Sequence, residues 1–142
     1  MLSLSAAALW IVEGLLMYLS TESVALFLRT IYATQREKSG SCIVGDVLNA
    51  AHMTSAMTAP LRDVWGKWAV LPQSGLAHPE AFFADIGFGI SVFQLGVDID
   101  YGRTDADTKA FWLSHARPTD RSADDPWPRN LLFRGNFLPA SH

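Results

Sequence analysis

The sequence contains a single cysteine, Cys42, among its 142 residues. One thiol cannot form an internal disulfide framework or a multi-cysteine zinc site, and it fits a reducing compartment. Lys and Arg number 11 against 14 Asp and Glu and form no run, so the counterion release that drives nucleic-acid binding has no evident source. We therefore expect a cytoplasmic protein that has no nucleic-acid partner.

The sequence also lacks an apolar run long enough to cross a membrane. Residues 2–19 are strongly apolar, but Glu13 interrupts them, and each remaining piece is shorter than the roughly 20 residues that a spanning helix needs. A secretory signal carries Lys or Arg before its apolar stretch, whereas the first basic residue here is Arg29. Neither a membrane span nor a secretory signal is expected.

Several motifs that carry chemistry are missing as well. The four histidines show no H-x-x-x-H or H-E-x-x-H spacing, so no metal site is predicted. No serine lies in a G-x-S-x-G context, which leaves a hydrolase nucleophile without support. Because no basic groove accompanies the five tryptophans, we interpret them as core and helix-packing groups; among them are Trp65, Trp68 and Trp112.

The first fifty residues show the pattern of an α/β unit. Residues 8–12 form a short apolar run that predicts a strand buried on both faces. Ser20 or Thr21 can cap a helix whose apolar residues recur at helical spacing, and residues 42–47 predict a second buried strand. Strand, helix and strand form the crossover unit of a parallel sheet, so we expect an α/β fold.

The remainder of the chain predicts two more strands and three helices. Residues 131–138 predict a final strand. Residues 96–129, rich in Asp, Thr, Arg and Pro, indicate a long surface loop. The other expected elements are helices from Pro60 to Trp68, from Pro79 to a stop at Gly87 and from Thr108 to His115, and a strand from Phe88 to Leu95.

Residues 9–19, LWIVEGLLMYL, closely resemble a segment of the leucine carboxyl methyltransferase-like family of class I S-adenosylmethionine-dependent methyltransferases. In that family a buried strand ends in Glu-Gly or Glu-Cys, followed by apolar residues, a Tyr and a helix cap. The order here is the same. The resemblance continues through Gly40-Ser41, the strand ending at Asp46, the segment Pro79 to Phe88 and, weakly, Tyr101-Gly102-Arg103.

The resemblance implies that residues 1–142 are the C-terminal part of a single methyltransferase domain. The expected fold is the C-terminal half of a Rossmann-like methyltransferase sheet, with parallel strands, helical crossovers and an antiparallel last strand at an edge. Family chains carry, further upstream, a glycine-rich loop that wraps the cofactor and an acidic residue that holds its ribose. Neither is present, and no G-x-G-x-x-G spacing occurs.

The resemblance also assigns candidate site residues. It implies that Glu13, at the end of the first strand, contacts the amino acid end of S-adenosyl-L-methionine; the alternative is a Glu that reaches solvent or pairs with a Lys. Tyr18 can wall the pocket and face a substrate, or it is simply half-buried at a strand-to-helix junction. Arg103 can pair with a substrate carboxylate, or it is a solvated loop residue.

Three functional hypotheses follow from the sequence. The first is a fragment of an O-methyltransferase acting on a carboxylate or hydroxyl of a small molecule or peptide. Methyl transfer from a sulfonium depends mainly on proximity and orientation, so no catalytic residue is named. The second is an inactive half-domain that acts as an interaction protein, and the third is an unrelated α/β domain. The exposed sheet edge of a half-domain would also favour self-association.

Overall fold

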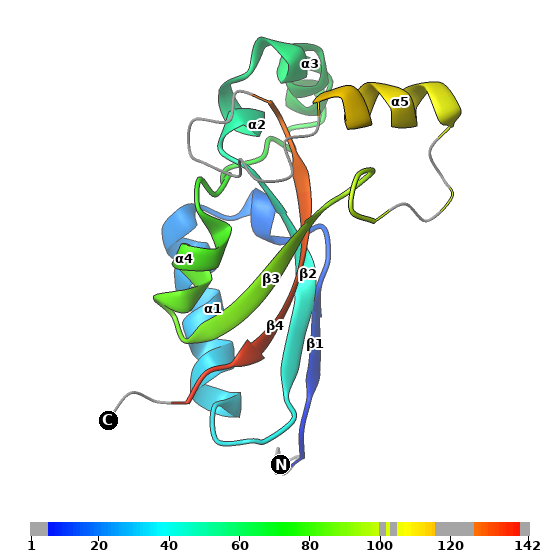
Figure 1. Ribbon diagram of the computed structural model, residues 1–142. Helices are drawn as coiled ribbons and strands as arrows, with labels where there is room; N and C mark the ends of the chain where they lie inside the picture. The colour runs from blue at the N-terminus through cyan, green and yellow to red at the C-terminus, as the bar shows by residue number, and fades with distance from the viewer. Residues whose placement is uncertain (1–5, 100–101, 103–104, 116–126, 140–142) are drawn as a thin grey trace.

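A computed structural model describes residues 6–99, 102, 105–115 and 127–139 of the chain, apart from the side chains of Trp112 and His115. Its elements follow one another as strands, α-helices and two 3₁₀ turns, η1 and η2 (Figure 1). In chain order they are β1 (Leu9–Val12), η1 (Leu16–Tyr18), α1 (Thr21–Gln35), β2 (Cys42–Leu48), α2 (Ala51–Thr54), η2 (Ala56–Thr58), α3 (Ala59–Lys67), α4 (Pro79–Ala84), β3 (Phe88–Gln94), α5 (Ala106–His115) and β4 (Asn130–Phe137).

The four strands form one mixed sheet in the order β1-β2-β4-β3. β1 and β2 are parallel, and β4 is antiparallel to both of its neighbours, so β1, β2 and β3 all run in one direction. The expected α/β fold is confirmed, and the last strand is antiparallel. It lies inside the sheet, however, and not at an edge. Leu131 and Phe133 are buried in the core, and an inner position lets both sides of this apolar strand form backbone hydrogen bonds.

α1 forms where the sequence predicts a helix. The side chain of Ser20 accepts a hydrogen bond from the backbone N–H of Ser23 and so caps the first turn. Glu22 lies in that turn, near the positive end of the helix dipole. Val24, Leu28 and Ile31 recur at helical spacing and are all buried, so the helix presents one apolar face to the sheet.

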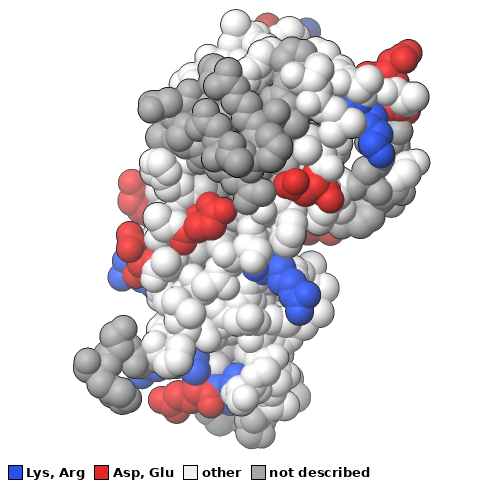
Figure 2. Space-filling view, viewed as in Figure 1, with Lys and Arg blue, Asp and Glu red and all other residues white. Residues whose placement is uncertain are grey.

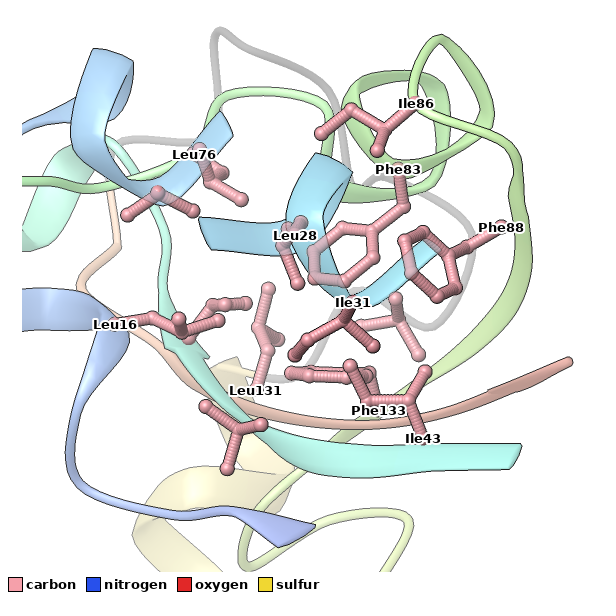
Figure 3. Packing of buried hydrophobic residues seen from close by; sticks show 14 residues of the cluster. Leu16, Leu28, Ile31, Ile43, Leu76, Phe83, Ile86, Phe88, Leu131 and Phe133 are labelled. Atoms are coloured by element: carbon pink, nitrogen blue, oxygen red, sulfur yellow. The ribbon is translucent and has the colours of Figure 1, made fainter. Parts of the chain in front are cut away.

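The core lies between the sheet and the helices α1 and α4, which cover the same face (Figure 1). Leu28 and Ile31 of α1 and Phe83 of α4 point toward the strands (Figure 3). The ring of Phe83 lies 4.7 Å from that of Phe133, measured between centroids. This aromatic contact joins α4 to the middle of β4.

The opposite face of the sheet differs from the sequence expectation. β1 was expected to be buried on both faces, yet Leu9 is 58% exposed and Ile11 67% exposed. Only Trp10 and Val12 of β1 turn toward the core. The expectation was wrong because a continuous apolar run shows that a strand can be buried on both faces, while burial itself requires a second covering layer.

Two further expectations are corrected. Trp68 was interpreted as a packing residue, but it follows α3 with 75% of its surface exposed. Arg129 was placed at the end of a surface loop, but its side chain is buried. Within the described residues, no helix is long and apolar enough to cross a membrane.

Candidate functional site

The carboxyl ends of β1, β2 and β3 point toward the same end of the molecule, where α2, α3 and α5 lie (Figure 1). In open α/β sheets, ligands bind outside this end of the strands, because the loops that follow the strands meet there. Glu13 directly follows β1, which places it at this end of the sheet. The region is therefore the candidate functional site.

A tight turn after β1 presents Glu13 to solvent. Gly14 has a φ of +62°, a left-handed conformation that residues with a Cβ adopt only with strain. Its N–H donates a hydrogen bond of 2.6 Å to Oδ1 of Asp46 on the neighbouring strand β2. The side chain of Glu13 is exposed beside this anchored turn. The turn thus holds the Glu13 backbone in place while the carboxylate stays free to meet a ligand.

Asp46 is the acidic residue that the sequence analysis did not assign to the site. It is only 6% exposed, although it lies in the middle of an otherwise apolar strand. Burial raises its pKa, the hydrogen bond from Gly14 opposes that shift, and the negative charge of Glu13 raises the pKa further. An Asp within a buried strand was the available signal, and the sequence analysis treated it only as the end of the strand.

Replacing Asp46 by Asn should raise the stability of the fold near pH 7. Because the folded-state pKa of Asp46 is raised, the ionised carboxyl destabilises the fold, and stability falls as pH rises from the unfolded pKa through the folded pKa. Asn keeps an acceptor for the Gly14 N–H and cannot ionise. The free energy of unfolding, measured in urea at a series of pH values, should fall from about pH 4 upward in the unmodified chain and should not do so in D46N.

Two controls complete this experiment. Asp46→Ala should cost about 1 to 3 kcal/mol, since it leaves the Gly14 N–H without its acceptor. Asp63→Asn, at an exposed position on α3, should leave the pH dependence unchanged. A D46N variant that loses stability at pH 7 to the same extent as D46A would contradict the role of ionisation.

A second polar cluster joins the ends of three strands. Oδ1 of Asn49 accepts the backbone N–H of Arg129 at 2.8 Å, and the Asn49 amide donates to the carbonyl of Trp127 at 2.8 Å. The Arg129 guanidinium donates to Oε1 of Gln94 at 2.7 Å. Asn49, Gln94 and Arg129 are all buried, so the cluster fixes the start of β4 against the ends of β2 and β3.

The two substrate-facing candidates have different outcomes. Tyr18 ends η1 and is half-buried, and the carbonyl of the preceding Met17 accepts the backbone N–H groups of Gln73 and Ser74. These bonds attach η1 to the loop before α4. The substrate role of Tyr18 stays a prediction. Arg103 lies outside the described residues.

A histidine of α2, His52, packs against a tryptophan of α3. His52 stacks on Trp65, with ring centroids 5.9 Å apart, and burial lowers its pKa. Its Nδ1 is buried and has no hydrogen-bond partner. In the described part of the chain, no group of three or more His, Cys, Asp or Glu is arranged to hold a metal ion.

Charge is spread thinly over the face shown in Figure 2. Acidic and basic side chains appear there singly or in small groups, separated by broad uncharged areas.

Comparison with known proteins adds no assignment. No family model matches the chain, and no curated protein shows significant similarity to it.

Proposed function

We propose that the chain is the C-terminal half of a Rossmann-like, S-adenosylmethionine-dependent O-methyltransferase domain, in which Glu13 binds the amino acid end of the cofactor. One observation carries the proposal. The exposed carboxylate of Glu13 stands at the carboxyl end of β1, on a turn that Gly14 and Asp46 hold in place. The antiparallel last strand supports it, since the resemblance to the methyltransferase family implies such a strand.

The residues at this turn fit the charge of the cofactor. S-adenosylmethionine supplies an activated methyl group on a sulfonium, and its methionine end carries an ammonium. Glu13 is close enough to Asp46 for its charge to raise the pKa of that carboxyl, so the turn concentrates negative charge. An ammonium bound by Glu13 would also relieve this repulsion. In this proposal Asp46 does not contact the cofactor itself; it holds the turn that carries Glu13 and adds to the negative charge there.

One carboxylate cannot bind the cofactor tightly. A hydrogen bond to a charged group contributes about 1.5 to 3 kcal/mol, whereas a dissociation constant of 1 mM already corresponds to about 4 kcal/mol. The described residues should therefore bind S-adenosylmethionine more weakly than 1 mM. A complete site requires the glycine-rich loop and the ribose-binding acid that the resemblance places in the other half of such a domain.

Weak binding can be tested by NMR titration of the ¹⁵N-labelled chain with S-adenosylhomocysteine, which carries the same ammonium and no methyl group. We expect progressive shifts of the Glu13 and Gly14 amide signals at millimolar ligand. Glu13→Gln should reduce the shifts at least several-fold, because it removes the charge that the ammonium meets. Glu37→Gln, at an exposed position beyond α1, is the matched control and should change nothing.

The contrary result is equally clear. Shifts that persist in E13Q, or that centre on residues away from the turn, would overturn the assignment of Glu13. If the spectrum does not change even at about 10 mM S-adenosylhomocysteine, roughly ten times 1 mM, this half does not bind the cofactor.

The methyl acceptor in this proposal is a carboxylate or hydroxyl of a small molecule or peptide. Attack on the methyl carbon needs the acceptor oxygen in line with the sulfur, and this is a matter of positioning. Tyr18 is the proposed wall of the acceptor pocket because it lies five residues after Glu13, where the chain leaves the sheet.

A second candidate function is supported by a separate observation. The segment from α3 to residue 71 exposes apolar side chains on the outside of the molecule, as an interaction surface does. They are Leu61, Val64, Trp68, Val70 and Leu71. An inactive half-domain that binds another protein through this segment would form a stoichiometric complex and show no response to S-adenosylhomocysteine.

The native protein distinguishes the two candidates. It can be captured from its source cells with an antibody against residues 130–142, and its intact mass measured. A mass well above 15.6 kDa would favour the methyltransferase proposal. A mass of 15.6 kDa, with a co-purifying partner at fixed stoichiometry, would favour the interaction protein.

A further inference from the structure

The segment that follows β2, from α2 through η2 to α3, buries little of its surface. Neither α2 nor α3 contains a fully buried side chain, and η2 contributes only Thr58. α1, in contrast, buries Val24, Leu28 and Ile31 in the core. Because local stability follows the apolar surface that a segment buries, α2 and α3 should come apart at a lower free energy than the whole fold needs to unfold.

A small set of hydrogen bonds holds α3 against α2. The Arg62 guanidinium donates to the carbonyl of Ser55 at 2.9 Å and to that of His52 at 3.4 Å. The Thr58 hydroxyl donates to the same His52 carbonyl at 2.9 Å. The backbone N–H of His52 in turn donates to Oδ1 of Asn49, a member of the buried polar cluster. His52 thus links α3 to the end of β2.

The imidazole of His52 fits this junction in its neutral form. It stacks on the Trp65 ring of α3, with the two planes inclined by 19°. Its buried Nδ1 has no hydrogen-bond partner within the described residues. A neutral imidazole can leave that nitrogen unprotonated, whereas an imidazolium carries an N–H on both nitrogens. Protonation would therefore place a donor without an acceptor at the junction between the two helices.

The charges around the ring also favour the neutral form. α2 and η2 carry no titratable group besides His52, and of the charged residues of α3, Asp63 and Lys67 are exposed. Burial lowers the pKa of His52, a contact with its own backbone opposes this shift in part, and the positive charge of Arg62 lowers the pKa further. Among the described residues, no carboxylate acts to raise it.

We propose that His52 is a pH-sensitive latch: when its ring gains a proton, α3 detaches from α2 while α1 and the sheet stay folded. Detachment lets the imidazolium reach water and separates it from Arg62. The change takes place at the carboxyl ends of β1, β2 and β3, the end of the molecule that holds the candidate site (Figure 1). The latch needs no cofactor and operates whether or not Glu13 binds one.

The direction of the pKa shift sets the pH range of the latch. The attached form binds the proton less well than the detached form, in which His52 has its ordinary pKa of 6.5. Above that pH neither form is protonated, and the equilibrium between them does not depend on His52. Below it the equilibrium moves toward the detached form, by up to about tenfold per pH unit, until the attached form also takes up the proton.

Hydrogen exchange of the backbone amides, followed by NMR between about pH 8 and about pH 5, tests the latch. Protection of the α3 amides, corrected for the intrinsic exchange rate, should be constant down to about pH 6.5 and then fall by up to about tenfold per pH unit. The α1 amides near Leu28 should show no such fall. Constant protection in α3, or an equal fall in both helices, would overturn the proposal. A rise in α3 would also overturn it, since stacking on Trp65 would then stabilise the imidazolium.

A matched pair of substitutions separates His52 from the other titratable groups. His52→Phe keeps an aromatic ring against Trp65 and cannot ionise, so protection of α3 should no longer fall below pH 6.5. His78→Gln, at an exposed position before α4, should keep the profile of the unmodified chain. A fall that persists in H52F, or one that disappears in H78Q, would assign the pH dependence to another group and contradict the latch.

Discussion

Replacing Gly45 by Ala should strongly destabilise the fold. A Cβ at Gly45 would overlap the backbone carbonyl of Val12 on the paired strand, and it would lie 2.8 Å from a ring carbon of Phe133. Neither can move freely, because the first belongs to the β1–β2 ladder and the second is a buried core ring. Overpacking of this kind costs about 3 kcal/mol or more.

That cost is large relative to the stability available. A domain of ordinary stability unfolds with about 5 to 15 kcal/mol, and this sheet has one face on which Leu9 and Ile11 remain exposed. Thermal or urea unfolding followed by circular dichroism should therefore show the transition of G45A shifted well below that of the unmodified chain.

Gly66→Ala is the control for this experiment. A Cβ at Gly66, within α3, would meet only the side chain of Leu71 at 3.9 Å, an ordinary contact. Ala restricts the unfolded chain more than Gly, so G66A should gain about 0.5 to 1 kcal/mol. If G45A unfolds like the unmodified chain, the close packing of β1, β2 and Phe133 is not what holds this sheet together.

Local signals predicted the first elements well. The apolar run at Leu9–Val12 and the spacing of Val24, Leu28 and Ile31 each identify an element by its own period, and Ser20 caps the helix as expected. These features depend on residues close together in the chain, which is why the sequence alone reveals them.

Features set by distant residues were not predictable in the same way. The inner position of β4 depends on its pairing with both β2 and β3, and no pattern within residues 130–137 distinguishes an inner strand from an edge strand. Burial of Arg129 has the same origin, since its partners Gln94 and Asn49 lie 35 and 80 positions away.

The candidate site shows the same division. Glu13 was identified from a short local motif, and the structure places it at the carboxyl end of β1. The contribution of Asp46 depends on a hydrogen bond from Gly14, 32 positions earlier, and on proximity to Glu13. A sequence motif cannot encode that proximity unless the strand register is known.

Truncating Leu28 to Ala should destabilise the fold by about 2 to 5 kcal/mol. Leu28 is fully buried on α1 and packs within the cluster that joins this helix to the sheet (Figure 3). Its removal takes away the transfer free energy of the side chain and leaves a cavity that the surrounding rings and strands fill only in part. The urea midpoint should fall with little change in the slope of the transition.

Leu26→Ala makes the same chemical change on the same helix two residues away. Leu26 is 68% exposed, so its truncation removes little buried area, and the higher helix propensity of Ala offsets part of that loss. The difference between the two variants therefore isolates the packing of α1 on the sheet. Similar losses in L26A and L28A would mean that the helix contributes through its own stability, and that the face presented by Val24, Leu28 and Ile31 is not the one that anchors it.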